Sequence, residues 1–257
     1  MTECVSRNAS HIVSLGRGQA AFRCAMAVFA LAFSWQVDAA VPNLDGIWRI
    51  TNGGGSFIPN DQKITAPLKG EYATVYAERR AAAARGTPMG DPTASCLPQG
   101  MPRFMNAIMP LEITQTPERI LIYAEWNMQV RRIYLDGRSF PPADELDPTF
   151  NGYSIGRWEK DELVVETRGL RGDTTFDGSG LPHSDALVVH ERLKLVDPDT
   201  LHNVMTVDDS KAFTNPWTVT KIYKRAPNFT IIEYVCMENN RNPIGEDGVT
   251  GFKHAGE

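Results

Sequence analysis

From residue 111 onward, the chain is a succession of short apolar runs in which hydrophobic and polar positions alternate. Alternation with a period of two predicts strands with one buried face. Turn sequences such as Asp136-Gly137 and Asp197-Pro198-Asp199 separate one run from the next. Together with a short strand signal near the N-terminus, the predicted strands are 43–50, 111–116, 120–126, 129–135, 153–158, 163–168, 187–195, 201–206, 217–223 and 231–236.

A strand series of this length has to remove its exposed sheet edges. The pattern therefore predicts a mainly β fold, an antiparallel up-and-down β-barrel, with a β-sandwich as the alternative. After residue 40, only 67–85 reads as a substantial helix, because it consists of strong helix formers and Gly86 is placed to end it.

Residues 90–110 form a predicted loop that is unusually apolar. Proline and glycine exclude long regular elements there, yet the segment carries Met101 and Phe104 among other hydrophobic residues. Such side chains suit a lid over an apolar ligand, so Met101 and Phe104 are candidate ligand-binding residues. The alternative is that they fill gaps in the core, which is the more common use of methionine.

The N-terminal segment has the order of a signal peptide. There is no charge between Arg23 and Asp38, and the apolar run at 24–35 is shorter than the roughly 20 residues that a membrane span needs. Val37 and Ala39 suit the positions that a signal peptidase reads, which predicts cleavage after Ala39. We expect a signal peptide at 1–39, a single β-barrel domain at 40–257, and a periplasmic or secreted protein with no membrane span in its mature form. An N-terminal anchor or a buried helix is the alternative.

The chain has four cysteines, of which Cys4 and Cys24 would leave with the signal peptide. The remaining two, Cys96 and Cys236, would stand alone in an oxidising compartment. A disulfide between them is the simplest prediction. The competing zinc-thiolate site lacks the close Cys or His partners that zinc needs.

Two resemblances are carried by these segments. The sequence Asp45-Gly46-Ile47-Trp48 is similar to the glycine-x-tryptophan of the first strand of lipocalins and other calycins, where the tryptophan plugs one end of the barrel. The longer stretch 96–241 resembles a family of uncharacterised exported bacterial β-barrel proteins. These resemblances imply a barrel and export, and bring no activity with them.

Composition and motifs exclude several function classes. The chain has a formal net charge of −5 and no basic run, which makes it a poor partner for nucleic acid. It has no phosphate loop, dinucleotide fingerprint, nucleophile elbow or paired-histidine metal motif. We therefore expect no cofactor and no metal.

His183 and Asp185 are the candidate catalytic pair. They lie two residues apart at the entry to a predicted strand, after a loop rich in glycine and aspartate. A carboxylate that orients a histidine could make it a general base or acid at neutral pH. The alternative is a hydrogen bond that closes the loop.

Two charged residues interrupt apolar strand faces. Glu191 shares a face with Val189 and Leu193, and Arg132 shares one with Val130 and Tyr134. If both faces point inward, we expect an ion pair between Glu191 and Arg132, since a lone buried charge is unfavourable. Such a pair could belong to a ligand site or could be purely structural.

Glu238 and Arg241 follow Cys236 directly, so the disulfide would hold them near the Cys96 loop, where they could line the mouth of a pocket. A solvated turn is the alternative for these two residues.

Two function classes remain. The first is a barrel that binds a small, largely apolar or aromatic molecule in its interior. The second is a cofactor-independent lyase, isomerase or dehydratase in which His183 is the base, Asp185 orients it, and Arg132 or Arg241 stabilises negative charge.

Overall fold

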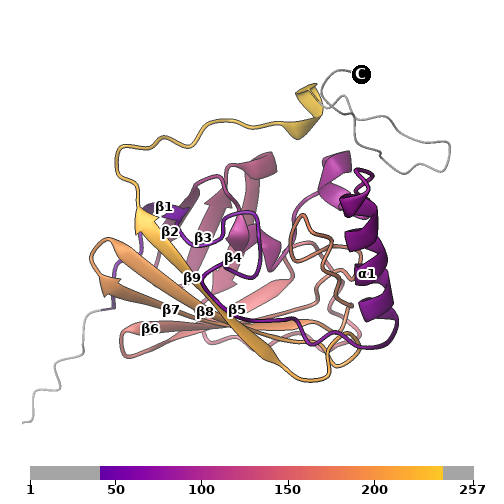
Figure 1. Ribbon diagram of the computed structural model, residues 1–257. Helices are drawn as coiled ribbons and strands as arrows, with labels where there is room; N and C mark the ends of the chain where they lie inside the picture. Colours follow the sequence, from indigo (N-terminus) through magenta and orange to yellow (C-terminus); the bar gives the residue numbers. More distant parts are fainter. Residues whose placement is uncertain (1–40, 240–257) are drawn as a thin grey trace, which may run out of the picture. The chain divides into compact units, whose positions relative to one another are not determined.

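The strand pattern closes into a nine-stranded barrel, as predicted, and the alternative sandwich is not formed (Figure 1). The computed structural model describes residues 41–239, so the predicted signal peptide and Arg241 lie outside the described residues. Each strand pairs with the next along the chain, and the first strand pairs with the last to complete the circle. The strands are β1 (Gly46–Ile50), β2 (Leu111–Gln115), β3 (Arg119–Ala124), β4 (Gln129–Tyr134), β5 (Tyr153–Glu159), β6 (Glu162–Arg168), β7 (Val188–Asp197), β8 (Thr200–Asp208) and β9 (Trp217–Arg225).

One pair of neighbouring strands is parallel, because an odd number of strands cannot alternate in direction all the way around a closed circle. This pair is β4 and β5, which share only two residue pairs, Ile133 with Ser154 and Tyr134 with Ile155. The other eight strand pairs in the described residues are antiparallel. The connection at 135–152 must therefore turn the chain back so that β5 starts beside the last residues of β4 and runs in the same direction.

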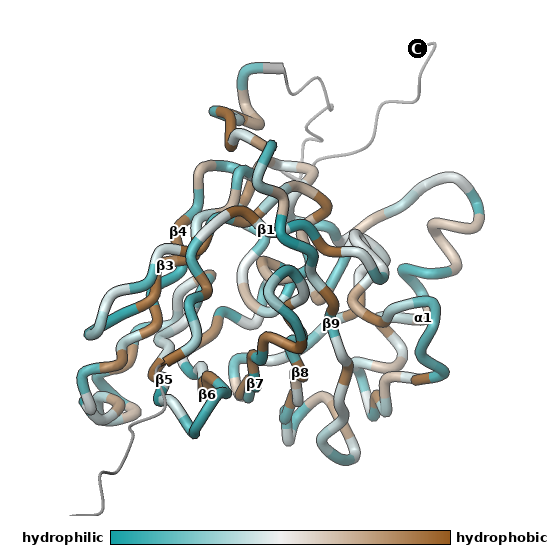
Figure 2. The backbone as a smooth tube through the Cα atoms, turned by 90° about the vertical axis from the view of Figure 1, so that its left-hand side faces the viewer, coloured by the Kyte–Doolittle hydropathy of each residue, from teal (hydrophilic) through white to brown (hydrophobic). Residues whose placement is uncertain are grey.

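Inward-facing side chains fill the barrel. Apolar positions lie along the strands and hydrophilic ones mainly at the turns (Figure 2). Trp48 is buried near the end at which β1 begins, where its Nε1 donates to the carbonyl of Leu44 at 2.9 Å. The guanidinium of Arg225, the last residue of β9, lies 4.3 Å from the centre of the Trp48 ring. Trp48 is thus a core residue that is held by Leu44 and contacted by Arg225.

Two loops fill another part of the interior. Lys221, which points inward from β9, donates to the carbonyl of Ser56 at 2.9 Å and to Oδ1 of Asn106 at 2.6 Å. The hydroxyl of Tyr223, two residues further on, donates to the carbonyl of Met105. The loop residues Phe57, Met101, Phe104 and Met105 are fully buried in the same apolar core as the strands. The predicted lid residues Met101 and Phe104 are therefore core residues, in line with the alternative interpretation.

The predicted helix at 67–85 is present as α1 (Gly70–Ala84). It begins later than expected because Leu68 forms a β-bridge with Phe213, and it ends before Gly86, whose φ of 81° favours glycine. The hydroxyl of Tyr76 lies 3.1 Å from that of Ser179, so α1 packs against the loop between β6 and β7 at the side of the barrel (Figure 1). Within residues 41–239 no helix is both long enough and apolar enough to cross a membrane.

The predicted strand at 231–236 is wrong. This segment runs across the barrel without a regular partner and ends in a short 3-10 helix, Cys236–Asn239 (Figure 1). Its backbone N–H groups bind side chains instead of a strand: Ile232 donates to Glu125 at 3.2 Å, and Cys236 donates to Asn127 at 3.2 Å. The ring of Tyr234 stacks on Trp126 with centroids 5.0 Å apart. The segment is thus attached to the β3–β4 connection by these contacts and not by a sheet, while Ile232 and Val235 remain exposed.

Candidate functional site

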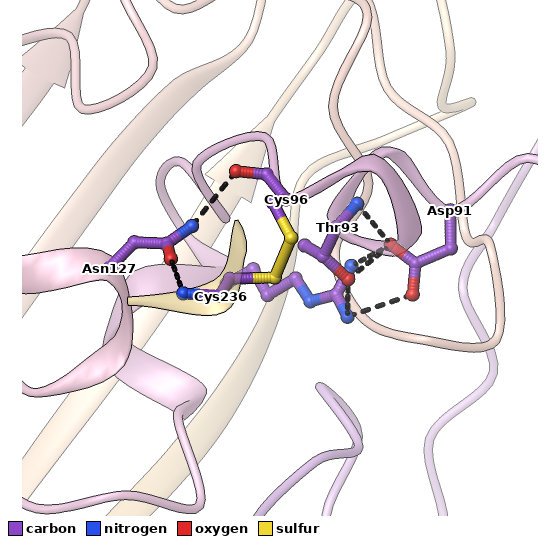
Figure 3. Close-up of a disulfide and its surroundings, with 6 residues drawn as sticks. Asp91, Thr93, Cys96, Asn127 and Cys236 are labelled. Carbon is purple, nitrogen blue, oxygen red and sulfur yellow. Dashed lines mark hydrogen bonds and ion pairs between the residues drawn. A yellow bond between two sulfur atoms is a disulfide. The ribbon is translucent and has the colours of Figure 1, made fainter. Parts of the chain in front are cut away.

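The predicted disulfide between Cys96 and Cys236 is confirmed; it joins residues 140 positions apart (Figure 3). Asn127 holds both halves, since its Nδ2 donates to the carbonyl of Cys96 at 2.9 Å and its Oδ1 accepts from the N–H of Cys236. On the Cys96 side, Arg103 forms an ion pair with Asp91 at 2.6 Å. Burial opposes ionisation of Asp91, but the hydrogen bonds from Arg103 hold the pKa of this carboxyl below its ordinary value. The disulfide therefore fixes the C-terminal segment to a rigid loop.

Glu191 faces the barrel interior, as predicted, and is 0 % exposed. Its partner, however, is Arg131 and not Arg132. Arg131 shares the inward face of β4 with Ile133, whereas Arg132 points outward and is exposed. The guanidinium donates to both oxygens of Glu191, with one of the two bonds at 3.1 Å. The predicted Arg132–Glu191 pair is corrected accordingly.

The Arg131 side chain connects four strands from the inside. Besides Glu191 on β7, it donates to the hydroxyls of Ser154 on β5 at 3.3 Å and Thr167 on β6 at 3.0 Å. Asn203 on β8 adds a hydrogen bond of 2.8 Å to the Glu191 carboxylate. All five side chains are buried, and each charge has several partners. The two opposite charges satisfy each other, which is the property of a structural ion pair, although Oδ1 of Asn203 has no hydrogen-bond partner among the described residues.

Near this network, burial changes the titration of two further β9 residues. Burial lowers the pKa of Lys221 to about 7. Burial, with the negative charge of Glu191 adding to it, raises the pKa of Tyr223. Both side chains are held by loop carbonyls, so they fasten the loops that fill the barrel.

His183 and Asp185 are not brought together. The buried imidazole of His183 lies with Nδ1 at 2.9 Å from the carbonyl of Ser184, which can only accept, so Nδ1 carries the proton. Nε2 then accepts from the hydroxyl of Thr174 at 2.8 Å. Burial lowers the pKa of His183. The carboxylate of Asp185, 60 % exposed, instead binds Lys211 at 2.6 Å. These contacts close the loop, which is the structural alternative for this pair.

The remaining predicted site residues do not gather in one place either. Glu238 is exposed on the C-terminal segment, Met101 and Phe104 lie in the core, and Arg241 is outside the described residues. Of the predicted ligand-binding residues that the structure describes, Arg132 lines a pocket on the outer surface of the barrel.

This pocket is a groove at the junction of β4 and β5, with a volume of about 400 Å³. It opens there because the register of β4 with β5 starts at Ile133, which leaves residues 129–132 of β4 without a β5 partner. One wall consists of Gln129, Val130 and Arg132, and the other is the end of the returning connection, with Phe150, Asn151 and Tyr153.

Aromatic rings form much of the groove. The rings of Tyr134 and Tyr153 are 5.2 Å apart, and Phe150 lies further along. Asn151 donates a long hydrogen bond of 3.5 Å to the carbonyl of Val130, which partly bridges the gap. Sequence reasoning missed Phe150, Asn151 and Tyr153 as site residues. The available signal was the aromatic content of the unusually long connection between two predicted strands.

The arginines around the groove differ in one respect. Arg138, Arg168 and Arg171 each form an ion pair with a carboxylate two residues away in the sequence, namely Asp136, Glu166 and Asp173. The side chain of Arg132, by contrast, forms no hydrogen bond or ion pair with any residue in 41–239.

These paired arginines also stack on the aromatic side chains around the groove. The guanidinium groups of Arg138 and Arg171 lie 3.8 Å and 4.6 Å from the ring centres of Tyr134 and Phe150. Among the described residues that line the groove, none is Asp or Glu. The groove thus combines apolar ring surface with one uncompensated positive charge.

No cluster of three or more potential metal ligands from His, Cys, Asp and Glu occurs in the described part of the chain. The comparison with known proteins adds no functional assignment to this geometry. Neither the protein-family models nor the curated proteins contain a match to the chain.

Proposed function

We propose that this protein is exported and that its barrel binds a small, largely apolar or aromatic molecule in the groove between β4 and β5. The observation that carries the proposal is the groove itself: about 400 Å³ of space, lined by Tyr134, Phe150 and Tyr153, at a break in the barrel wall. Small-molecule sites commonly have this volume and combine aromatic walls with a few polar groups. The disulfide supports export, because such bonds persist in oxidising compartments.

The site differs from the expected one in the barrel interior. Loop side chains such as Phe57 and Phe104 fill the interior, and the buried charges of Arg131 and Glu191 are paired with one another. Acid–base catalysis by His183 and Asp185 has no comparable support. The carboxylate of Asp185 forms an ion pair with Lys211, and the imidazole of His183 is hydrogen-bonded to Thr174. The geometry therefore favours binding on the outer wall.

The test is a nuclear magnetic resonance titration of the full chain with two neutral aromatic probes, indole and naphthamide. We expect the largest shifts in the amides of residues 129–132 and 149–153, and weaker binding by Tyr153→Ala because a stacking face is lost. Phe229→Ala, a change to an exposed aromatic residue after β9 that contacts Arg49 of β1 and does not line the groove, is the matched control and should bind as the wild type does. Shifts confined to the barrel interior, or no saturable shift at all, would overturn the proposal.

A further inference from the structure

The unpaired arginine of the groove defines a ligand class. We infer that the groove takes an aromatic carboxylate, whose ring lies against Tyr134 and Tyr153 and whose carboxylate meets the guanidinium of Arg132. This inference rests on the proposed function and names the chemistry of its ligand. A planar guanidinium matches a carboxylate with two parallel hydrogen bonds, which is why an arginine on a pocket wall favours this group.

The contrast with the neighbouring arginines supports the inference. Arg138 and Arg171 stack on rings of the same groove, but Asp136 and Asp173 neutralise them. Within residues 41–239 Arg132 has no such carboxylate, although the chain has five more acidic than basic side chains. Its charge is therefore free to be matched by a ligand.

The position of Arg132 also fits a ring and an anion bound at once. On β4 its side chain points to the same face as Tyr134, two residues further along, and both residues line the groove. The ring of Tyr153 faces Tyr134 from the start of β5. A molecule with an aromatic ring directly attached to a carboxylate spans such neighbouring contacts without needing a flexible linker. A neutral amide of the same shape keeps the ring contacts and loses the charge.

The experiment compares naphthoate with naphthamide by calorimetric titration of the full chain at pH 7. We expect naphthoate to bind about tenfold more tightly, the effect of one good charge-assisted interaction at a half-open site. Arg132→Gln should reduce naphthoate affinity about tenfold and naphthamide affinity much less, so that the preference for the carboxylate disappears. Arg157→Gln removes an exposed arginine of β5 that does not line the groove, and should leave both affinities as in the wild type.

The possible outcomes separate a failure of the carboxylate inference from a failure of the proposed binding function. Equal affinity for the two probes, with shifts in the groove, would overturn the carboxylate inference and leave the proposed binding function intact. The carboxylate inference also fails if Arg132→Gln weakens both probes equally, because Arg132 would then only shape the groove. Binding of neither probe would overturn the proposed function together with the inference. Since the side chain of Arg132 is exposed and forms no hydrogen bond or ion pair in the described part of the chain, its variant should melt as the wild type does.

Discussion

Arg131 and Glu191 lie side to side within the barrel, with two guanidinium N–H groups donating to the two oxygens of one carboxylate. Their side chains are 1 % and 0 % exposed. A buried pair of this kind offsets the cost of removing two charges from water, and either partner left alone would be strongly unfavourable. Substitutions of Arg131 and Glu191 therefore test whether the two side chains are partners inside the barrel.

Glu191→Gln and Arg131→Met should each lower the free energy of unfolding by about 3–5 kcal/mol, because each leaves one buried group without its partner. The double variant should recover part of this loss, which is the sign of coupling in a double-mutant cycle. Thermal or denaturant unfolding measures all three. The control is Arg132→Met, a change to the neighbouring outward-facing arginine, which should cost less than about 0.5 kcal/mol. Strictly additive single effects would show that the two residues are not partners.

The choice between Arg131 and Arg132 shows what the sequence could predict here and what it could not. Alternation along β7 placed Glu191 inside correctly, because its neighbours on that face are aliphatic. On β4 the same argument failed, since Val130 and Tyr134 are apolar although they face outward. They are half-covered by the connection at 135–152, which returns over the outer wall. Local alternation holds no information about such a distant segment.

Other elements were predictable for the same kind of reason. Strand positions and α1 follow from local periodicity and helix propensity, and the disulfide from the count of cysteines. The segment 231–236 has the composition of a strand, but its contacts to Glu125, Asn127 and Trp126 take the place of a partner strand. The groove depends on where the β4–β5 register starts, which is a property of the closed barrel as a whole.

Lys221 should make stability rise with pH in the alkaline range. Burial lowers its pKa to about 7, while the unfolded chain keeps the ordinary value near 10.5. Between these values the unfolded chain binds a proton that the folded chain does not, so the free energy of unfolding increases by at most about 1.4 kcal/mol per pH unit. Denaturant unfolding at pH 7, 8 and 9 should show this slope, and Lys221→Met should lose it.

The matched control for that slope is Lys224→Met, a change to an exposed lysine of the same strand. It should retain the wild-type dependence. Lys221→Met also removes the donor to Asn106 and Ser56, so a lower overall stability is expected and is not the readout. Identical slopes in the wild type and in Lys221→Met would contradict the prediction.

His183 should contribute to acid destabilisation. Burial lowers its pKa in the folded protein, so below about pH 6.5 the unfolded chain takes up a proton that the folded chain resists. Stability from this group is therefore present at neutral pH and is lost as the pH falls. His183→Gln should have a shallower loss of stability between pH 7 and 5, whereas His202→Gln, a change on the outer face of β8, should behave as the wild type. Equal losses in all three proteins would exclude this role.

The disulfide should be detectable and should stabilise the fold. Peptide mapping without reduction, on protein from an oxidising compartment, should find Cys96 linked to Cys236. In the chain-entropy account, closing a loop of this length contributes about 4–5 kcal/mol. A reductant should therefore lower the melting temperature of the wild type. It should have no such effect on the Cys96→Ser/Cys236→Ser variant. Alkylation of either cysteine in unreduced, denatured protein would contradict the bond.

The groove follows from the odd number of strands in the barrel. With nine strands, β4 and β5 cannot be joined by a tight turn, because both run the same way. The chain must turn back through the connection 135–152, and the end of this connection with the start of β5 supplies Phe150, Asn151 and Tyr153 as a second wall. In a barrel with one strand more or fewer, β4 and β5 could be antiparallel and joined by a hairpin in place of 135–152. The gap between these two strands would then close. The groove thus depends on the number of strands in the barrel as much as on any residue that lines it.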